Sequence, residues 1–453
     1  MAMSIAIAKE IAGTGATLPV DSAPDSPRGR LTAAMVECVS RIGYAATTVS
    51  EITAVSRLSR SSFYENFRNK ECCFLAAQSE LSAALRAEVA QAVSAERPER
   101  ALQAALGSVI AFCAREPHGF HLLTHEAMIA GPRALDARDE LMLALEGIVE
   151  RSLAERSDQD DLADIPTRLV LGGAVRLLGI SMRRAGGASE AAIEALPGWL
   201  ECYAVPAAQM RWREMTSAAS DLDLILERPV RPSPPQPLPR GRHRLSAQEV
   251  RSVRRERILY ATAAAVCANG YQAVTVADIA SVAGVSREAF YASFKDKQDA
   301  FLQTQRFIFE QMVAASAGAF FTSPKPWPER IWDSLRTTTA WVIDQPVLAH
   351  FDFIETYSLG PTDAERVDEY VLAFNIFLEE GYRYRPESAD LPRMYAEAIA
   401  GAVLELCAFY VRHGREAELP QLLPLAAYMI LTPFMGAKQA VDLIDGLVAS
   451  SAR

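Results

Sequence analysis

The 453-residue chain lacks the long apolar runs and alternating strands by which several large classes of protein are recognised. No run of 18 or more apolar residues occurs, which predicts that no segment spans a membrane. The first 27 residues lack the charged start and long apolar centre of a secretion signal, so we expect a disordered tail on a cytoplasmic protein. Strand-like alternation is missing, whereas apolar residues at helical spacing recur throughout. The chain is therefore expected to be all-α.

Cysteine pairs and catalytic patterns are equally sparse. The seven cysteines are an odd number without any CxxC spacing, which indicates reduced, mostly buried thiols. A redox sensor at Cys72 and Cys73 is the alternative, although adjacent residues of a helix point in different directions. No serine, histidine and aspartate set, phosphate loop or metal motif with useful spacing is present. We expect no enzymatic activity, no catalytic residue, no cofactor and no bound metal.

Three histidines, His118, His121 and His125, have a spacing that can place them on one helical face. A metal site is one interpretation, but Pro117 puts His118 at a helix boundary, and no acid or thiol completes an obvious set. A contribution of His121 and His125 to a ligand pocket is the second interpretation, and ordinary packing or surface placement is the third. We keep His121 and His125 as candidate ligand-binding residues.

The formal net charge of −10 argues at first against a nucleic-acid partner. The distribution of charge reverses that impression. Residues 28–70 hold seven basic and three acidic residues, a net +4, and residues 240–297 hold ten and five, a net +5. The remainder of the chain therefore carries −19. Two basic patches on an acidic body predict a protein that places only particular faces against phosphate.

One short aromatic and basic stretch occurs twice. SRSSFYENFRNK occupies residues 59–70, and SREAFYASFKDK follows 227 positions later. Between Gly43 and Leu75, 15 of 33 positions are identical at that constant offset. Glu126 then pairs with Glu355 at offset 229, and Gly173 pairs with Gly401 at offset 228. The whole unit of about 200 residues is therefore expected to be present twice.

The signals for helix boundaries agree between the two copies. In each, a glycine is expected to end the first helix, a capping box to start the second, and a serine to cap the third. In the first copy these are Gly43, Thr48 with Glu51, and Ser59; in the second they are Gly270, Thr275 with Asp278, and Ser286. Valines and an isoleucine supply the buried stripe of the second helix: Val49, Ile52 and Val55, or Val276, Ile279 and Val282.

The third helix of each copy has two faces. Its aromatics at i and i+4 are expected to pack inward, and its other face is small, polar or basic. Two short helices joined by a tight turn, the second with such a face, predict a helix-turn-helix. That second helix can enter the major groove while a lysine at the next helix start, Lys70 or Lys297, meets phosphate. A helix with a merely aromatic core face is the plain alternative, which the combined cap, spacing, lysine and local charge disfavour.

The turn before the third helix differs between the copies. The second copy has Gly284, whereas the first has Arg57. A non-glycine residue at positive φ costs on the order of 1 kcal/mol. Either this turn has a slightly different geometry, or Arg57 recovers the cost at a phosphate. We expect a usable but altered first site.

Residues 271–302, YQAVTVADIASVAGVSREAFYASFKDKQDAFL, resemble the DNA-binding segment of the TetR family of transcriptional regulators nearly position for position. The first copy is similar but more divergent, with Arg57 as the departure that matters. The match covers about 50 residues in each half, and beyond them only helix pattern and isolated landmarks agree. The resemblance implies a three-helix DNA-binding domain, a larger helical domain that binds a small-molecule effector, and dimerisation through the last two long helices.

Carried onto this chain, the resemblance implies recognition helices at residues 60–67 and 287–294. The dimerisation helices would be residues 166–184 with 190–205, and 393–413 with 419–434. Arg60 and Arg287 lie at helix starts and can reach a phosphate or a guanine edge. The residues expected to contact DNA are Thr48, Arg57, Arg60, Ser61, Tyr64, Asn66 and Lys70 in the first copy, and Thr275, Arg287, Glu288, Tyr291 and Lys297 in the second.

The two halves are separated by a proline-rich stretch and differ in aromatic content. Six prolines from Pro229 to Pro239 predict a semi-rigid connector with basic flanks. The second half is rich in aromatics, most of which belong in a helical core, and we choose Phe353, Tyr357 and Phe377 as the subset that lines a ligand cavity. The expected domains are a tail (1–27), a first helix-turn-helix domain (28–75), a first helical regulatory domain (76–227), a linker (228–244), a second helix-turn-helix domain (245–302) and a second regulatory domain (303–453).

These patterns predict a sequence-specific transcriptional regulator that binds a double-stranded DNA operator and an unknown small-molecule effector. Repression is the favoured outcome, and activation stays open. The two halves are expected to fold together as an intramolecular pseudo-dimer; a homodimer of whole chains, each unit pairing with its own kind, is the competing arrangement. The alternative function is a helical ligand- or partner-binding protein in which one helix-turn-helix, foremost the first, has lost DNA binding.

Overall fold

The computed structural model describes residues 25–155, 167–185, 189–203, 246–357, 369 and 372–451. Every regular element in these ranges is helical, which confirms the all-α prediction. The first 24 residues of the expected tail and the whole expected linker lie outside the described residues. The chain divides into two compact units, of which the first holds the described residues up to 155, then 167–171 and most of Leu178–Ile193. The second unit holds Gly172–Leu177 and the described residues from Glu194 onward.

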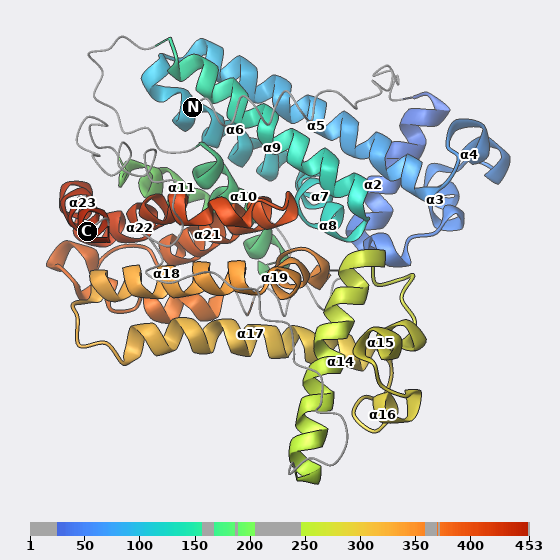
Figure 1. Cartoon of the computed structure of the whole chain (residues 1–453). Helices are drawn as coiled ribbons and strands as arrows, with labels where there is room; N and C mark the ends of the chain where they lie inside the picture. Colours follow the sequence, from blue (N-terminus) through green and yellow to red (C-terminus); the bar gives the residue numbers. More distant parts are fainter. Residues whose placement is uncertain are drawn as a thin grey trace. The chain divides into compact units, whose positions relative to one another are not determined.

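The first unit begins with three helices and a long fourth, drawn in blue in Figure 1. A π-helical turn, Leu122–Glu126, interrupts the helices that follow. The elements in chain order are α2 (Pro27–Ala46), α3 (Val49–Ser56), α4 (Arg60–Asn66), α5 (Lys70–Ala95), η1 (Pro98–Arg100), α6 (Ala101–Arg115), α7 (Pro117–His121), the π-turn η2, α8 (Ala127–Ile129) and α9 (Pro132–Leu153), with part of α10 (Thr167–Ala185) and the start of α11 (Glu190–Glu201).

The local signals of the first copy act as the sequence predicts. Helical geometry breaks at Gly43, where φ is 75°, although one more turn follows before Thr47. Thr48 and Glu51 form the capping box, in which the hydroxyl and the carboxylate each accept a backbone N–H of the other residue. Phe63 and Phe67 are buried with residues of α2, α3 and α5. One apolar core thus holds α4 against the start of the long helix α5.

The second unit repeats this order and continues into a helical bundle, drawn from yellow-green to red in Figure 1. The predicted helix end at Gly270 and the capping box of Thr275 with Asp278 are both confirmed. The elements are α14 (Ala247–Asn269), α15 (Val276–Ala283), α16 (Arg287–Tyr291), α17 (Lys297–Phe321), α18 (Trp327–Asp344), α19 (Pro346–Phe353), η4 (Glu355–Tyr357), η5 (Phe374–Phe377), η6 (Gly381–Arg383), η7 (Pro386–Ser388), α21 (Met394–Arg412), η8 (Glu416–Glu418), α22 (Leu419–Met435) and α23 (Ala437–Ser451).

Two details of the sequence interpretation are corrected. Val282 was expected in the buried stripe of α15, but its side chain is 56% exposed, because Ile279 and Ala283 take the inward positions. A further helix, α23, follows α22 and was not anticipated. The helices assigned to dimerisation are present as α10, α11, α21 and α22, and residue 166 and residues 204 and 205 of those ranges lie outside the described residues.

Helix α21 is long and apolar enough to cross a membrane by length and composition, the one such helix among the described residues. Two thirds of its apolar window (67%) is buried inside the protein. That burial is typical of a core helix of a bundle, which needs the same apolar composition. The seven cysteines are all free thiols, as expected.

Within the second unit, short stretches of α10 and α11 pack against α21 and α22. An ideal Cβ at Gly173 would lie 2.7 Å from the carbonyl oxygen of Ala398, and one at Gly401 would lie 3.5 Å from the carbonyl oxygen of Gly173. Tyr203 donates from its hydroxyl to the Met429 carbonyl at 2.9 Å. The aligned glycines of the two copies therefore lie at one close helix crossing, where only a missing side chain permits the approach.

Candidate nucleic-acid interface and cavity

The two short helices α4 and α16 each have an exposed polar face and an opposite face of buried aromatic side chains. Ser59 and Ser286 cap them by accepting the backbone N–H three residues later, both at 3.1 Å. Phe63 and Phe290 are fully buried, while the neighbouring Tyr64 is 56% exposed. Tyr291, its counterpart, is 57% exposed. The matched exposure places one large aromatic side chain at the same position on the open face of both helices.

The aromatic frame under this face is nearly the same in both copies. The Phe63 and Tyr64 rings lie edge to face at 5.3 Å between centroids, and their counterparts Phe290 and Tyr291 do so at 5.4 Å. An arginine covers the next ring at each site, as in the stacking of Arg28 on Phe67 at 4.6 Å. Equal geometry on two divergent sequences indicates that the frame fixes where the exposed residues point.

In each copy a lysine contacts the tyrosine that directly follows the glycine at which the first helix breaks or ends. The Lys70 ammonium donates to the Tyr44 carbonyl at 2.8 Å and lies 4.1 Å from the centre of the Tyr44 ring. Lys297 does the same to Tyr271, at 2.8 and 4.2 Å. Burial lowers the pKa of both lysines. Both were expected to meet phosphate; their role in holding the fold was not anticipated, and an ammonium with three donors keeps two for other partners.

Arg57 occupies the left-handed region that its position predicts. Its φ and ψ are 54° and 39°, against 61° and 42° at Gly284. It is the one non-glycine residue with positive φ among the described residues. The first of the two expectations for this turn, a different geometry, is therefore wrong. Arg57 adopts the strained conformation and leaves its side chain exposed.

The remaining predicted contact residues are not equally available. Arg60 and Arg287 are exposed at the helix starts, and neither has an ion pair within the described ranges. Ser61 is exposed and donates to Glu65 at 3.3 Å on the same helix. Asn66, in contrast, is half-buried and donates from its amide to the Ser62 carbonyl at 2.8 Å. A base contact by Asn66 would first have to break this bond, while Glu288 is exposed.

Comparison with known proteins agrees with this geometry. A family model described as bacterial regulatory proteins of the tetR family matches residues 31–77 and again residues 258–304. The chain carries two TetR-family DNA-binding segments in tandem. Both matches run from the first helix into α5 or α17, so they contain each helix-turn-helix described above. The chain thus has the DNA-binding element of a family of transcription regulators twice.

A solved structure of a TetR family transcription regulator from Marinobacter aquaeolei VT8 is similar at 18% identity. The match covers 45% of this chain and 97% of that one, with a TM-score of 0.32. No curated protein matches the chain.

In the first TetR-family segment, helix α2 is joined to the helices behind it by two polar contacts. Ser40 is hydrogen-bonded to Nδ1 of His118. The Tyr44 backbone N–H donates to Oε2 of Glu126 at 2.7 Å. In the second copy the aligned pair Cys267 and Val347 is also in contact, since the Cys267 thiol lies 3.6 Å from the Val347 carbonyl oxygen. These contacts join the first helix of each copy to a helix that follows the helix-turn-helix.

The histidines of the first unit have an acid, Glu126, among their neighbours. Nε2 of His121 lies 3.3 Å from Oε1 of Glu126, and the rings of His121 and His125 are 5.0 Å apart. One ligand atom from each of the three residues falls within 4.8 Å of the others. The sequence interpretation found no acid to complete the set, because it assumed α-helical spacing. The π-turn changes the register and places Glu126 beside His121. The absence of a metal stays a prediction, as does the ligand role of both histidines.

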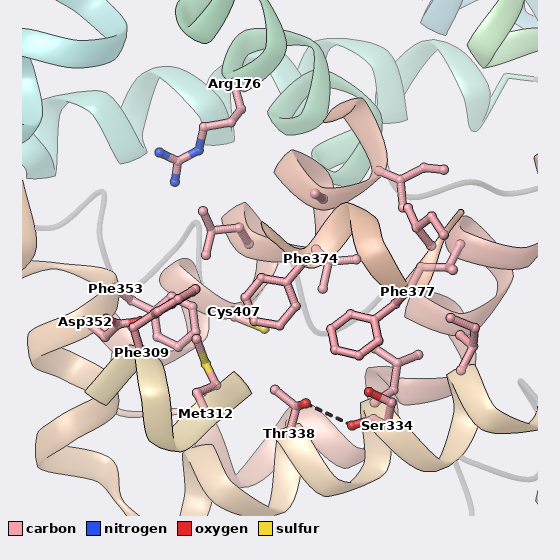
Figure 2. Close-up of a pocket in the computed structure, with 18 of the residues that line it drawn as sticks. Arg176, Phe309, Met312, Ser334, Thr338, Asp352, Phe353, Phe374, Phe377 and Cys407 are labelled. Carbon is pink, nitrogen blue, oxygen red and sulfur yellow. Dashed lines mark hydrogen bonds between the residues drawn. The ribbon is translucent and has the colours of Figure 1, made fainter. Parts of the chain in front are cut away.

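The second unit contains a cavity of about 150 Å³. Its lining residues come from helices α10, α17, α18, α19, α21 and α22 with η4 and η5. Phe353, Tyr357 and Phe377 all line it, as Figure 2 shows for the two phenylalanines, whereas His121 and His125 do not. That these residues bind a ligand remains a prediction. Arg176, which also lines the cavity, was missed because it lies 181 positions before Tyr357, its hydrogen-bond partner.

Proposed function

We propose that the protein is a transcriptional repressor that binds one operator with both helix-turn-helix units and leaves it when a small molecule binds. The observation that carries the proposal is the pair of matched recognition faces on α4 and α16. Each has the same cap, the same buried phenylalanine and the same exposed tyrosine. Double-stranded DNA is the partner, and we place the protein in the cytoplasm with it.

The two faces share their caps and aromatic packing, but their exposed polar residues differ. Ser61 aligns with Glu288, and Glu65 aligns with Ala292, so the donors and acceptors offered to base edges are not the same. A regulator with one repeated helix reads a palindrome. This chain is proposed to read two unlike half-sites with one molecule, since each copy supplies its own recognition helix.

An intramolecular pseudo-dimer is supported by the contacts around Gly173 and Gly401. In a two-fold interface the same patch of each partner meets the other, and these two glycines are aligned positions of the two copies. The nearby tyrosines are reciprocal, because Tyr203 donates to the Met429 carbonyl and Tyr428 donates to the Tyr203 carbonyl at 3.3 Å. A covalent tether between such partners raises their effective concentration into the mM range.

The ligand response is proposed to act on the separation of the recognition helices. A ligand that fits the cavity better when the helices do not match the operator lowers DNA affinity by its differential binding energy. The cavity walls include α17, which begins at Lys297, the residue that holds Tyr271 of the second DNA-binding segment. A shift of α17 would therefore reach the helix-turn-helix directly.

Selection of bound DNA from a random pool tests this function. The expected site has two half-sites of different sequence, one helical turn or a multiple of it apart. A single perfectly palindromic site would contradict the pseudo-dimer and favour a homodimer of whole chains. Recovery of no preferred sequence would contradict the repressor itself. A mass measurement of the complex in solution then counts the chains on one site.

A further inference from the structure

The cavity of the second unit is almost entirely apolar, yet it contains one acid. Phenylalanine, methionine, isoleucine and leucine side chains form most of its wall, and Figure 2 shows the rings of Phe309, Phe353, Phe374 and Phe377 around it. Asp352, on α19, is among the residues that line the same space, and Figure 2 labels it beside Phe309 and Phe353. A charge in such surroundings is costly unless it is paired.

The other polar groups of the cavity wall have partners in the protein. Thr338 donates to the Ser334 carbonyl at 2.9 Å, and Ser334 donates to the Ser316 carbonyl at 3.3 Å. Thr356 is hydrogen-bonded to the amide of Gln305. These hydroxyls are used in holding the helices together, and they do not require a ligand.

Arg176 is the cation of the cavity wall, and it is also engaged. Its Nη1 donates to the Tyr357 hydroxyl at 2.5 Å, and its guanidinium lies 5.8 Å from the centre of the Tyr357 ring. An anionic ligand would therefore compete with an existing contact. Burial is the cause of the raised pKa of the Asp352 carboxyl.

Asp352 differs from these groups because it has no hydrogen-bond or ion-pair partner in the part of the chain that the structure describes. Burial raises the pKa of its carboxyl to about 7, and no cation lowers it. The group is only partly exposed, so water cannot solvate it fully. What the cavity lacks is a positive charge placed against Asp352.

We propose that this cavity binds a small hydrophobic amine in its protonated form, with the ammonium paired to the Asp352 carboxylate. The aromatic side chains of the wall favour the same ligand, because ring faces attract a cation. A cavity near 150 Å³ is of the size that holds one benzene ring, which limits the ligand to about one ring or a short branched chain. The inference gives a chemical class to the effector of the proposed repressor and rests on that proposal only for its regulatory meaning.

Three probes with one phenyl ring and different charge separate this proposal from its alternatives. Phenethylamine carries an ammonium, phenethyl alcohol is neutral, and phenylacetate carries a carboxylate. Calorimetric titration of the full chain at pH 8 is expected to show the amine binding at least about tenfold more tightly than the alcohol, since a buried bond between charged groups contributes this much. Phenylacetate is expected to bind most weakly.

Two variants make the test specific. Asp352→Asn keeps the shape of the side chain and is expected to remove the preference for the amine over the alcohol. Asp390→Asn, an exposed acid of the same unit, is expected to leave all three affinities unchanged. Failure of every probe to bind at millimolar concentration, tightest binding of phenylacetate, or an amine preference that survives in Asp352→Asn would each overturn the proposal. Thermal unfolding of each variant shows that it is folded.

A separate measurement connects binding to the proposed function. If phenethylamine binds through Asp352 and also lowers the affinity of the chain for its selected DNA site, both proposals hold. If it binds through Asp352 without any effect on DNA affinity, the amine site stands and the ligand-responsive mechanism fails. The two results are obtained on the same protein preparation, so they are distinguishable.

Discussion

The Lys70 ammonium lies over the ring of Tyr44 and donates to the carbonyl of the same residue, and this relationship recurs between Lys297 and Tyr271. Each lysine begins a long helix, and each tyrosine directly follows the glycine at which the first helix breaks or ends. Each pair therefore ties the helix-turn-helix to the first regulatory helix at its boundary. The same contact therefore joins the first helix to the long helix in both copies.

Replacement of Lys297 by methionine removes this tie. The change is expected to lower the free energy of unfolding by about 2 kcal/mol, because it removes a charge-assisted hydrogen bond and a cation–π contact. Lys295→Met is the matched control, since that lysine is exposed and is expected to change stability by less than about 0.5 kcal/mol. Denaturant unfolding measures both. Equal stability of the two variants would show that the tie contributes nothing.

Arg57 supplies a test of strain against function. Arg57→Gly is expected to stabilise the chain by up to about 1 kcal/mol, because glycine adopts φ of 54° freely. Gly284→Ala is expected to cost a similar amount at the equivalent position. If Arg57 also contacts phosphate, Arg57→Gly reduces the slope of log affinity against log salt by about 1. A stabilised protein with an unchanged salt slope would show that Arg57 does not touch DNA.

The recognition faces can be removed one at a time. The double change Arg60→Ala with Tyr64→Ala, and separately Arg287→Ala with Tyr291→Ala, are each expected to weaken binding to the selected site by about tenfold or more. Binding curves on that site and on unrelated DNA measure the loss of specificity. Loss with only the second pair would make the first unit a structural partner. Loss with neither pair would end the regulator interpretation.

Gly173 tests the close helix crossing. An added Cβ would lie 2.7 Å from the Ala398 carbonyl oxygen and 2.9 Å from the Trp199 ring, so Gly173→Ala is expected to cost about 1–3 kcal/mol. Gly318→Ala is the matched control, since no atom lies within 4 Å of its added Cβ, and this exposed helix position should gain slightly. Thermal unfolding compares them. A Gly173→Ala chain as stable as the control would mean that the crossing is not tight in solution.

The sequence predicted the DNA-binding segments well because their signals are local. Caps, helix ends and the two phenylalanines lie within a few residues of the structure they determine, and each signal is present twice. The cavity was predicted less completely. Phe353, Tyr357 and Phe377 were chosen from aromatic content. No local sequence pattern predicts that Asp352 lines the cavity. Arg176 reaches Tyr357 only through tertiary packing, and the π-turn shifts Glu126 toward His121.

Asp352 makes stability depend on pH in a direction opposite to that of an ordinary surface acid. Its folded pKa of about 7 lies above the ordinary value of 3.8, so the folded chain binds more protons than the unfolded chain between these values. The free energy of unfolding is therefore expected to fall as pH rises from about 4 to 7, by up to about 4 kcal/mol. Asp352→Asn should lose this slope, match the wild type near pH 4 and exceed it at pH 8.

The same titration sets the pH dependence of amine binding. An ammonium pairs with the ionised carboxylate, so affinity for phenethylamine is expected to drop about tenfold per pH unit below 7 and to level off above it. The other ionisable groups of the wall stay fixed in this range, because Arg176 remains charged and burial raises the pKa of Cys407 to about 12. His350 lies on the same helix but does not line the cavity, and burial lowers its pKa from 6.5. A pH profile that Asp352→Asn retains would therefore assign the titration to His350 and remove Asp352 from ligand recognition.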